Sequence, residues 1–421
     1  MGLARARRRT YVGLVATPID ELDAMDGYGA VMRRATIVLT LILAAALVAV
    51  SPAAAQNVRK GPRGDAFYTP PKPLKGKHGS LIWARRQTGS DALKRNARLL
   101  LYRSKSVDGD TVAVSGSLTL PSGRKPRGGW PVVTYAPGTV GVADACAPTR
   151  GYDGNTLVSY AYPLLHRFLN AGFAVVRTDY EGLGTPGVHP FLIGRSEGRG
   201  VLDAVRAARQ LEPRLSRRYV IAGHSQGGHA ALFAAATARR WVPDLRLRGT
   251  VALAPASHLE EQFRLTRSLS NAGGGLGAFV ALGLRAVDTV AAQLYLPELL
   301  TDRARALYPQ TLRRCLDTLG APDSFGGLPL NEILRGDAQL DPLFSFVGAQ
   351  DPESLKLNSR VRILQGSADG TVFASFTSQL VGDYQTRGTK VAYTLYDGVT
   401  HAGVVEAGGA DATRWIKRRL K

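Results

Sequence analysis

The chain has 421 residues, of which 54 are Lys or Arg and 33 are Asp or Glu, so its formal net charge is +21. A basic balance of this size can favour nucleic acid or an anionic surface. The arginines are scattered, however, and neither basic–aromatic interleaving nor a nucleic-acid motif is present, which argues against nucleic-acid binding. We therefore expect a basic surface with a loose attraction to anionic surfaces.

The N-terminal region has the layout of an export signal. A basic head begins at Met32, an uncharged run covers residues 35–50, and three small residues end at Ala55. This order is typical of a secretory signal peptide that is cut before Gln56. We interpret residues 1–31 as an upstream over-extension, residues 32–55 as the signal peptide and the mature protein as secreted. An uncleaved N-terminal anchor is the alternative, although the apolar run is shorter than the roughly 20 residues of a membrane span.

The body of the chain alternates strand-like and helix-like segments. A hairpin is predicted from two strands on either side of Asp108-Gly109-Asp110, and it supplies an antiparallel edge. Apolar strands that alternate with helices then predict an α/β fold with a largely parallel sheet covered on both faces. This core is expected to span residues 56–254 and 361–421. The predicted strands are residues 97–103, 111–120, 131–136, 173–178, 219–222, 250–254, 361–364 and 391–396, and the clearest helices are 160–169, 200–211 and 230–236.

The alternation is interrupted over residues 255–360, which contain no convincing sheet strand. We predict that this insert is a helical cap, and its best helix is residues 279–296. Apolar residues recur there at four-three spacing and are expected to bind substrate, although they could simply pack within the insert. This apolar stripe consists of Val280, Leu284, Val287, Ala291 and Leu294.

The sequence Gly223-His224-Ser225-Gln226-Gly227 stands between a predicted strand and a predicted helix. A serine at such a tight turn takes strained backbone angles, and side chains two residues before and after it would collide. Glycine-rich turns are common, but the flanking elements favour the nucleophile elbow of an α/β-hydrolase. The hydroxyl of Ser225 is then the nucleophile.

The remaining catalytic residues follow by elimination, because in this fold the acid and then the histidine come after the serine. Of the seven histidines, only His401 lies beyond the last strand. Asp369 stands just past the strand at 361–364. Asp351, Asp383 and Asp397 are rivals, but Asp397 is more simply a turn residue and Asp383 is expected to follow a helix. His224 and His229 are expected to be hydrogen-bonded structural histidines.

These residues predict a serine hydrolase mechanism. His401 takes the proton of Ser225 as the hydroxyl attacks an acyl carbonyl, and Asp369 orients the imidazole. The oxyanion is stabilised by the Gln226 N–H and by a second backbone donor from Gly138 or Thr139. The sequence shows no metal-ligand spacing, and the chemistry needs neither a metal nor an organic cofactor.

With these motifs in hand, the chain resembles the secretory lipases, a family of α/β-hydrolases typified by fungal lipase A and found widely in bacteria. The resemblance spans most of the mature chain. It implies secretion, ester hydrolysis and a cap that forms the acyl site. Pro137 stands where histidine is expected in many relatives. The matching stretches are residues 136–139, 145–148, 178–184, 223–228 and 254–256, and the loops of Asp369 and His401.

Export and the resemblance together give a role to the two cysteines. Cys146 lies beside the oxyanion loop and Cys315 lies inside the insert. In an exported protein two thiols suggest one disulfide, here tying the cap to the core. Two separate buried thiols are the alternative.

The function predicted is that of a secreted serine carboxylester hydrolase, most simply a lipase that cleaves acylglycerols or related fatty-acyl esters through an acyl-enzyme. The expected partner is a small-molecule or lipid ester, with association to a lipid interface possible and no obligate protein partner. A serine acyltransferase or peptidase on the same scaffold remains open, because a triad does not reveal the acceptor. A non-catalytic envelope-binding protein is a further alternative, and the intact set of Ser225, Asp369 and His401 argues against it.

Overall fold

The computed structural model describes residues 58–87, 93, 97–150, 156–268 and 275–421. The predicted extension and signal peptide, residues 1–55, lie outside the described residues. Their boundaries therefore stay predictions.

A nine-stranded sheet forms the centre of the fold, with the order β1-β2-β3-β5-β4-β6-β7-β8-β9. The strands β1, β2, β3 and β5 pair antiparallel, whereas all pairs from β5 to β9 are parallel. Every predicted strand is present, and β1 is an additional edge strand. The bounds are β1 Leu81–Arg86, β2 Ala97–Lys105, β3 Thr111–Thr119, β4 Trp130–Ala136, β5 Ala174–Glu181, β6 Leu215–His224, β7 Arg246–Leu253, β8 Val361–Gly366 and β9 Val391–Tyr396.

Helices cover both faces of the sheet, because alternate residues of each strand enter different cores. On β6, Tyr219 and Ile221 join the core under α4 (Gly194–Leu211), α5 (Gln226–Trp241) and α12 (Ala374–Thr386). Val220 and Ala222 join the opposite core. The helices over that core are α3 (Tyr162–Asn170), α13 (Gly403–Ala407) and α14 (Gly409–Leu420), and the short helix α2 (Thr156–Ser159) precedes α3.

The helix α4 begins six residues before the predicted start at residue 200. Its first turns carry the polar residues Ser196 and Glu197, which break the apolar pattern and so hide the helix from a periodicity argument. Both residues are nevertheless buried. The hydroxyl of Ser196 donates to Glu181, and Glu197 belongs to a buried polar network beneath the candidate site, described below.

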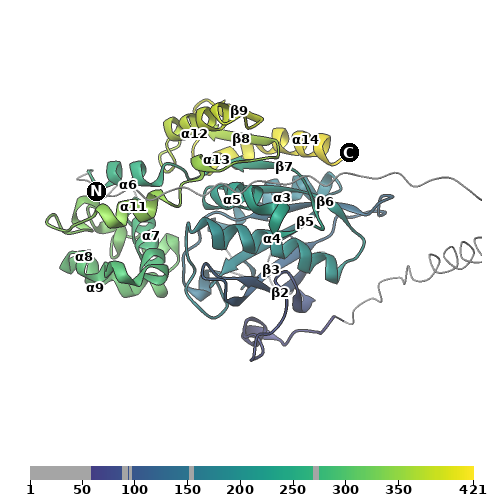
Figure 1. Cartoon of the computed structure of the whole chain (residues 1–421), viewed down its shortest axis with the longest axis horizontal. Coiled ribbons are helices and arrows are strands. Elements are labelled where there is room, and N and C mark those ends of the chain that lie inside the picture. Colours follow the sequence, from purple (N-terminus) through teal and green to yellow (C-terminus); the bar gives the residue numbers. More distant parts are fainter. Residues whose placement is uncertain (1–57, 88–92, 94–96, 151–155, 269–274) are drawn as a thin grey trace, which may run out of the picture. The chain divides into compact units, whose positions relative to one another are not determined.

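The insert between β7 and β8 is helical, and Figure 1 shows its helices grouped at one end of the sheet. It has a hydrophobic core of its own, which includes Leu282, Phe325 and Ile333. Within the described residues of the insert the only β pairing is an isolated bridge between Leu300 and Leu334. The helices are α6 Leu259–Arg267, α7 Leu276–Val290, α8 Leu296–Leu299, α9 Asp302–Leu307, α10 Leu316–Leu319 and α11 Asp341–Gly348.

The prediction of one helix over residues 279–296 was wrong at its C-terminal end. The helix α7 stops at Val290, and the chain bends by 113° before it continues through a short 3-10 turn into α8. Ala291 leaves the helical region, Tyr295 is left-handed with φ 46°, and Pro297 lies in the first turn of α8. Pro297 suits the first turn of α8, where its missing N–H is not needed, and α7 ends before it although the apolar periodicity continues. Within the described residues no single helix is long and apolar enough to span a membrane, and this bent pair meets the length and composition criteria only when its two parts are joined.

Candidate active site

Ser225 occupies a sharp turn between β6 and α5. Its backbone has a positive φ, with φ 58° and ψ −121°, a combination that non-glycine residues rarely adopt. A Cβ atom on Gly223 would lie 1.9 Å from the carbonyl oxygen of Gly227, and one on Gly227 would lie 1.9 Å from that of Ala136. Both positions therefore exclude any side chain, as the sequence argument expected. A non-glycine residue held at such angles costs about 1–3 kcal/mol, which the surrounding packing must supply.

The side chains of Asp369 and His401 are joined. Asp369 follows β8, and its Oδ2 accepts a hydrogen bond of 2.7 Å from Nδ1 of His401. Its Oδ1 accepts the backbone N–H groups of Thr371 and Val372 at 2.9 and 2.8 Å. Burial raises the pKa of Asp369, but the hydrogen bond and charge of His401, with the two amides, outweigh it and hold the pKa below its ordinary value. The carboxylate is thus fixed in its charged form.

None of the rival carboxylates contacts His401 within the described structure. Asp351 accepts the backbone N–H of Leu259 at the start of α6, and Asp397 accepts the hydroxyl of Ser367. The expectation that Asp383 follows a helix was wrong, because it lies inside α12, with a carboxylate oxygen 3.6 Å from Nε2 of His258.

His224 connects the serine turn to the loop of His401. Its Nε2 donates to the backbone carbonyl of His401 at 2.9 Å, and the two rings lie 4.5 Å apart. Its Nδ1 therefore accepts the hydroxyl of Tyr160, at 2.7 Å. Burial, together with the charge of His401, holds the pKa of His224 well below its ordinary value, so this ring is neutral.

Because Nδ1 of His401 donates its hydrogen bond to Asp369, Nε2 is the nitrogen that can accept a hydrogen bond from the hydroxyl of Ser225. In the described structure the two side chains are not hydrogen-bonded to each other. Such contacts are often loose in the absence of substrate and tighten in the reacting complex. The catalytic roles of Ser225, Asp369 and His401 stay predictions.

A buried polar network lies beneath the turn, and sequence reasoning missed it. Glu197, which is fully buried, accepts Nε2–H of Gln226 at 2.7 Å and lies 3.0 Å from Nδ1 of His229. The same Gln226 amide donates to Nε2 of His189 at 2.7 Å. His229 also donates from Nε2 to the backbone carbonyl of Gln350, in the insert. No spacing rule links these residues, since they come from α4, α5, the loop before α4 and the insert, and meet only in the folded chain.

The predicted oxyanion donors lie at the mouth of the same turn. Gln226 is the first residue of α5, where backbone N–H groups have no partner inside the helix. Of the two residues proposed for the second donor, Thr139 lines the cavity beside Ser225. Gly138 does not line this cavity, and its backbone N–H is hydrogen-bonded to the hydroxyl of Tyr160. The geometry therefore favours Thr139 over Gly138.

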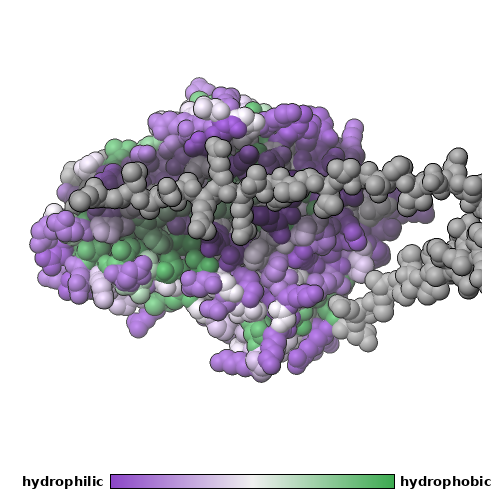
Figure 2. Space-filling view, viewed as in Figure 1, coloured by the Kyte–Doolittle hydropathy of each residue, from purple (hydrophilic) through white to green (hydrophobic). Residues whose placement is uncertain are grey.

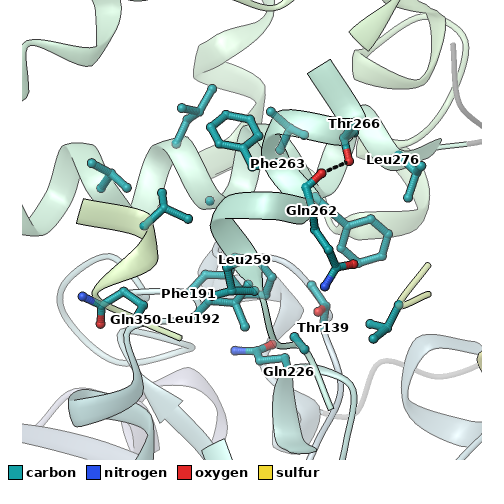
Figure 3. A pocket seen from close by; sticks show the side chains of 18 of the residues that line it. Thr139, Phe191, Leu192, Gln226, Leu259, Gln262, Phe263, Thr266, Leu276 and Gln350 are labelled. Atoms are coloured by element: carbon teal, nitrogen blue, oxygen red, sulfur yellow. Dashed lines mark hydrogen bonds between the residues drawn. The ribbon is translucent and has the colours of Figure 1, made fainter. Parts of the chain in front are cut away.

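A largely apolar cavity of about 160 Å³ opens beside Ser225. Figure 3 shows Thr139 and Gln226 close together at its base, below the apolar side chains of α6 and α7. Val280, Leu284 and Val287, predicted to bind substrate, all line it. Ala291 and Leu294, the last residues of the predicted stripe, do not, because α7 ends before them. Figure 2 shows hydrophobic surface gathered in the hollow on the cap side of the molecule.

The predicted disulfide is present. Cys146 and Cys315 are bonded, with their Cα atoms 5.5 Å apart and a sequence separation of 169. The backbone N–H of Leu316 also donates to the carbonyl of Val140, at 2.9 Å. The cap is thus tied, covalently and by backbone pairing, to the loop that carries Thr139.

Comparison with solved structures shows that the fold is that of an α/β-hydrolase. Solved structures that resemble the chain include lipase A from Candida antarctica in its closed state, with a TM-score of 0.70 and 20% identity over 84% of this chain and 85% of that one. The rice cell wall degrading esterase LipA from Xanthomonas oryzae aligns with a TM-score of 0.66 and 20% identity, over 82% of this chain and 99% of that one. The predicted α/β-hydrolase fold with a helical cap is confirmed.

Sequence comparisons also show a similarity to the secretory lipases. The secretory lipase family model matches residues 153–298, which confirms the resemblance predicted from the motifs. Lipase A of Moesziomyces aphidis is 28% identical over 235 residues, 52% of this chain and 50% of that protein. Lipase 5 of Candida albicans is 29% identical over 200 residues, 44% of this chain and 42% of that protein. The alignments thus span about half the length of these two relatives.

One relative carries a different description. The protein named "Probable inactive lipase MT1628" from Mycobacterium tuberculosis is 25% identical over 383 residues, 85% of this chain and 82% of that protein. Likeness to lipases therefore does not by itself establish activity. Whether this chain is active depends on the residues at its own candidate site.

Proposed function

We propose that the chain is a serine carboxylester hydrolase that cleaves fatty-acyl esters. The observation that carries the proposal is the strained Ser225 turn, which opens onto an apolar cavity in a fold that also holds a hydrogen-bonded Asp369–His401 pair. A nucleophile, a base oriented by an acid and an apolar chamber are together what acyl-ester cleavage needs.

The proposed reaction has two halves. The Ser225 hydroxyl attacks the ester carbonyl while His401 takes its proton at Nε2, and the imidazolium then protonates the departing alcohol. Water next attacks the acyl-enzyme with His401 again as base, which releases the fatty acid and restores Ser225. In both halves the backbone N–H groups of Gln226 and Thr139 stabilise the oxyanion, and the loss of one such donor typically costs about 3 kcal/mol.

The buried network supports this assignment because it fixes Gln226 from below. The side-chain amide of Gln226 is held by Glu197 and His189, so the first turn of α5 cannot rotate away from the cavity. Preorganised donors stabilise a developing charge without having to reorient during the reaction. A polar cluster this deeply buried is costly unless its members are paired, and here they are paired with one another.

The direct test is labelling with a fluorophosphonate, followed by mapping of the modified peptide. We expect one label on Ser225 and release of acid from p-nitrophenyl esters. The variant Ser225→Ala should take no label and lose nearly all hydrolysis, since loss of a triad nucleophile costs on the order of a millionfold in turnover. Labelling without hydrolysis would point to an acyltransferase, and absence of label would place the chain with the relative described as inactive.

We further propose that the protein is secreted and that the mature chain begins at Gln56. The support is the signal-like layout of residues 32–55, the secretory lipase match and the disulfide, a bond that persists in oxidising compartments. N-terminal sequencing of protein recovered from culture medium tests this. Recovery of a cytoplasmic chain that begins at Met1, with two reduced thiols, would overturn it.

A further inference from the structure

A second cleft lies away from the candidate active site and is lined by arginine. It has a volume of about 550 Å³, and its walls come from α5, β7, the segment before β8 and α14. We call it the arginine cleft. Its basic residues are Arg239, Arg248, Arg360, Arg418 and Arg419, and no carboxylate is among the residues that line it.

The charge of this cleft is not neutralised from within the described structure. None of its five arginines forms an ion pair with a described Asp or Glu, whereas Arg206 pairs with Asp244 and Arg362 with Asp411 just outside it. The contacts of Arg248 and Arg419 are to a backbone carbonyl and to the ring of Trp415. The positive charge of the cleft is therefore open to an anion.

Buried polar atoms at the cleft point to the same ligand. Tyr219 is fully buried, it lines the cleft, and its hydroxyl has no partner among the described residues. The hydroxyl of Ser359 and Nε of Arg419 are also buried without a partner. A buried polar group left unpaired costs about 1–3 kcal/mol, and an acceptor that reached these atoms through a small movement of the lining side chains would relieve that cost.

Helix termini do not account for the cluster. Arg239, Arg418 and Arg419 stand in the last turns of α5 and α14, where cations favourably meet the helix dipole. Arg248 lies on β7 and Arg360 lies in the segment before β8, and neither position has that reason to be basic. The two share the cleft with the helical arginines and with Tyr219.

We propose that the arginine cleft binds phosphate groups. A phosphate offers several strong acceptor oxygens, which match the fork of donors on arginine and the two hydroxyls. The group could belong to a soluble polyphosphate or to the headgroup of an anionic lipid. The net positive charge of the chain would draw either toward the protein over a long range.

The cleft is separate from the catalytic chamber. Tyr219 lies six residues before Ser225 along an extended strand, a distance of roughly 20 Å at about 3.3 Å per residue. In Figure 1 the C-terminal end of α14 and the cap helices lie at opposite ends of the molecule. A phosphate ligand in the cleft would thus hold the protein while leaving the apolar cavity open. Phosphate binding in the arginine cleft does not depend on whether the protein hydrolyses esters.

The test removes charge from the two arginines outside the helices. The variant Arg248→Gln/Arg360→Gln is compared with Arg86→Gln/Arg98→Gln, which removes the same charge from two exposed arginines that face each other across β1 and β2. Binding of inorganic pyrophosphate is followed by calorimetry, and binding to phosphatidylcholine vesicles with and without phosphatidylglycerol by co-sedimentation. These two arms distinguish a soluble phosphate from a lipid headgroup.

We expect the cleft variant to lose at least tenfold in affinity in one arm or both, while the control variant changes less than twofold. Tyr219→Phe should weaken binding without lowering the melting temperature, because its hydroxyl has no partner to lose. Hydrolysis of a soluble ester should be unchanged in all variants. Equal losses of affinity in the cleft and control variants would show that only net charge matters, which would overturn the site. Wild-type affinity in the cleft variant would overturn it as well.

Discussion

Gly283 offers the sharpest test of the cavity as an acyl site. It lies on α7 between Val280 and Val287, one helical turn from each, and lines the cavity with them. Apart from the backbone of its own helix, a Cβ added at this position would meet no heavy atom within 4 Å. The position is thus a helix-interior glycine with empty space where a side chain would stand.

Two substitutions at Gly283 should have opposite consequences. Gly283→Ala should stabilise the protein by about 0.5–1 kcal/mol, because alanine loses less backbone entropy in a helix than glycine does. Gly283→Phe should fill space that an acyl chain would use. If its ring displaces about four methylenes, at about 0.8 kcal/mol each, the loss for a long acyl chain is about 3 kcal/mol. That corresponds to about two orders of magnitude in kcat/KM.

The assay is hydrolysis of p-nitrophenyl acetate, octanoate and palmitate by each variant, together with its melting temperature. Gly382 supplies the matched control, since it lies inside α12, away from the cavity, and is equally open to an added Cβ. Gly382→Ala and Gly382→Phe should leave the ratio of palmitate to acetate hydrolysis unchanged. If Gly283→Phe lowered all three esters in equal proportion, α7 would not contact the acyl chain and the reasoning would fail.

Three further predictions concern stability and the cap. Replacing both Cys146 and Cys315 by serine should lower the free energy of unfolding by about 2–5 kcal/mol in chemical denaturation, and an unchanged value would mean that the bond is not formed in solution. Burial, with the charge of Glu353, raises the pKa of Asp351 to about 7 despite the amides of Leu259 and Glu260. The folded state then binds this proton more tightly than the unfolded state, so its contribution to stability is present below pH about 4 and lost as pH rises through about 7. Asp351→Asn should flatten that part of the melting profile, and a profile as steep as that of the wild type would contradict the assignment. Leu284→Asp, which places a carboxylate on the cavity wall, should weaken octanoate and palmitate hydrolysis more than acetate hydrolysis, and proportional losses on all three would indicate a structural defect alone.

The sequence was informative where a feature is determined by local sterics. The Ser225 turn could be predicted because Gly223 and Gly227 are forced by contacts within a few residues and with one neighbouring strand. The sheet could be predicted because its strands are apolar on both faces. The order of the acid and the histidine along the chain then sufficed to select Asp369 and His401, which the structure joins by a hydrogen bond.

Features that depend on packing between distant elements could not be predicted in this way. Glu197 looks like an ordinary charged helix residue until α5 packs against α4 and brings Gln226 and His229 to its carboxylate. The role of His224 was anticipated only as structural, because its bond to the carbonyl of His401 spans 177 positions. In both cases a polar residue is buried with a partner that no local pattern identifies.

The helix α7 shows that a correctly recognised apolar periodicity can still place the end of a helix wrongly. The apolar repeat continues through Ala291 and Leu294, yet the chain leaves the helix after Val290 to enter α8. Because α7 stops there, Ala291 and Leu294 do not line the cavity, and its wall is completed by α6 and α11 rather than by a longer α7. The acyl chain would therefore meet three helices instead of one stripe, and the gap that Gly283 leaves among them is where its length should be sensed.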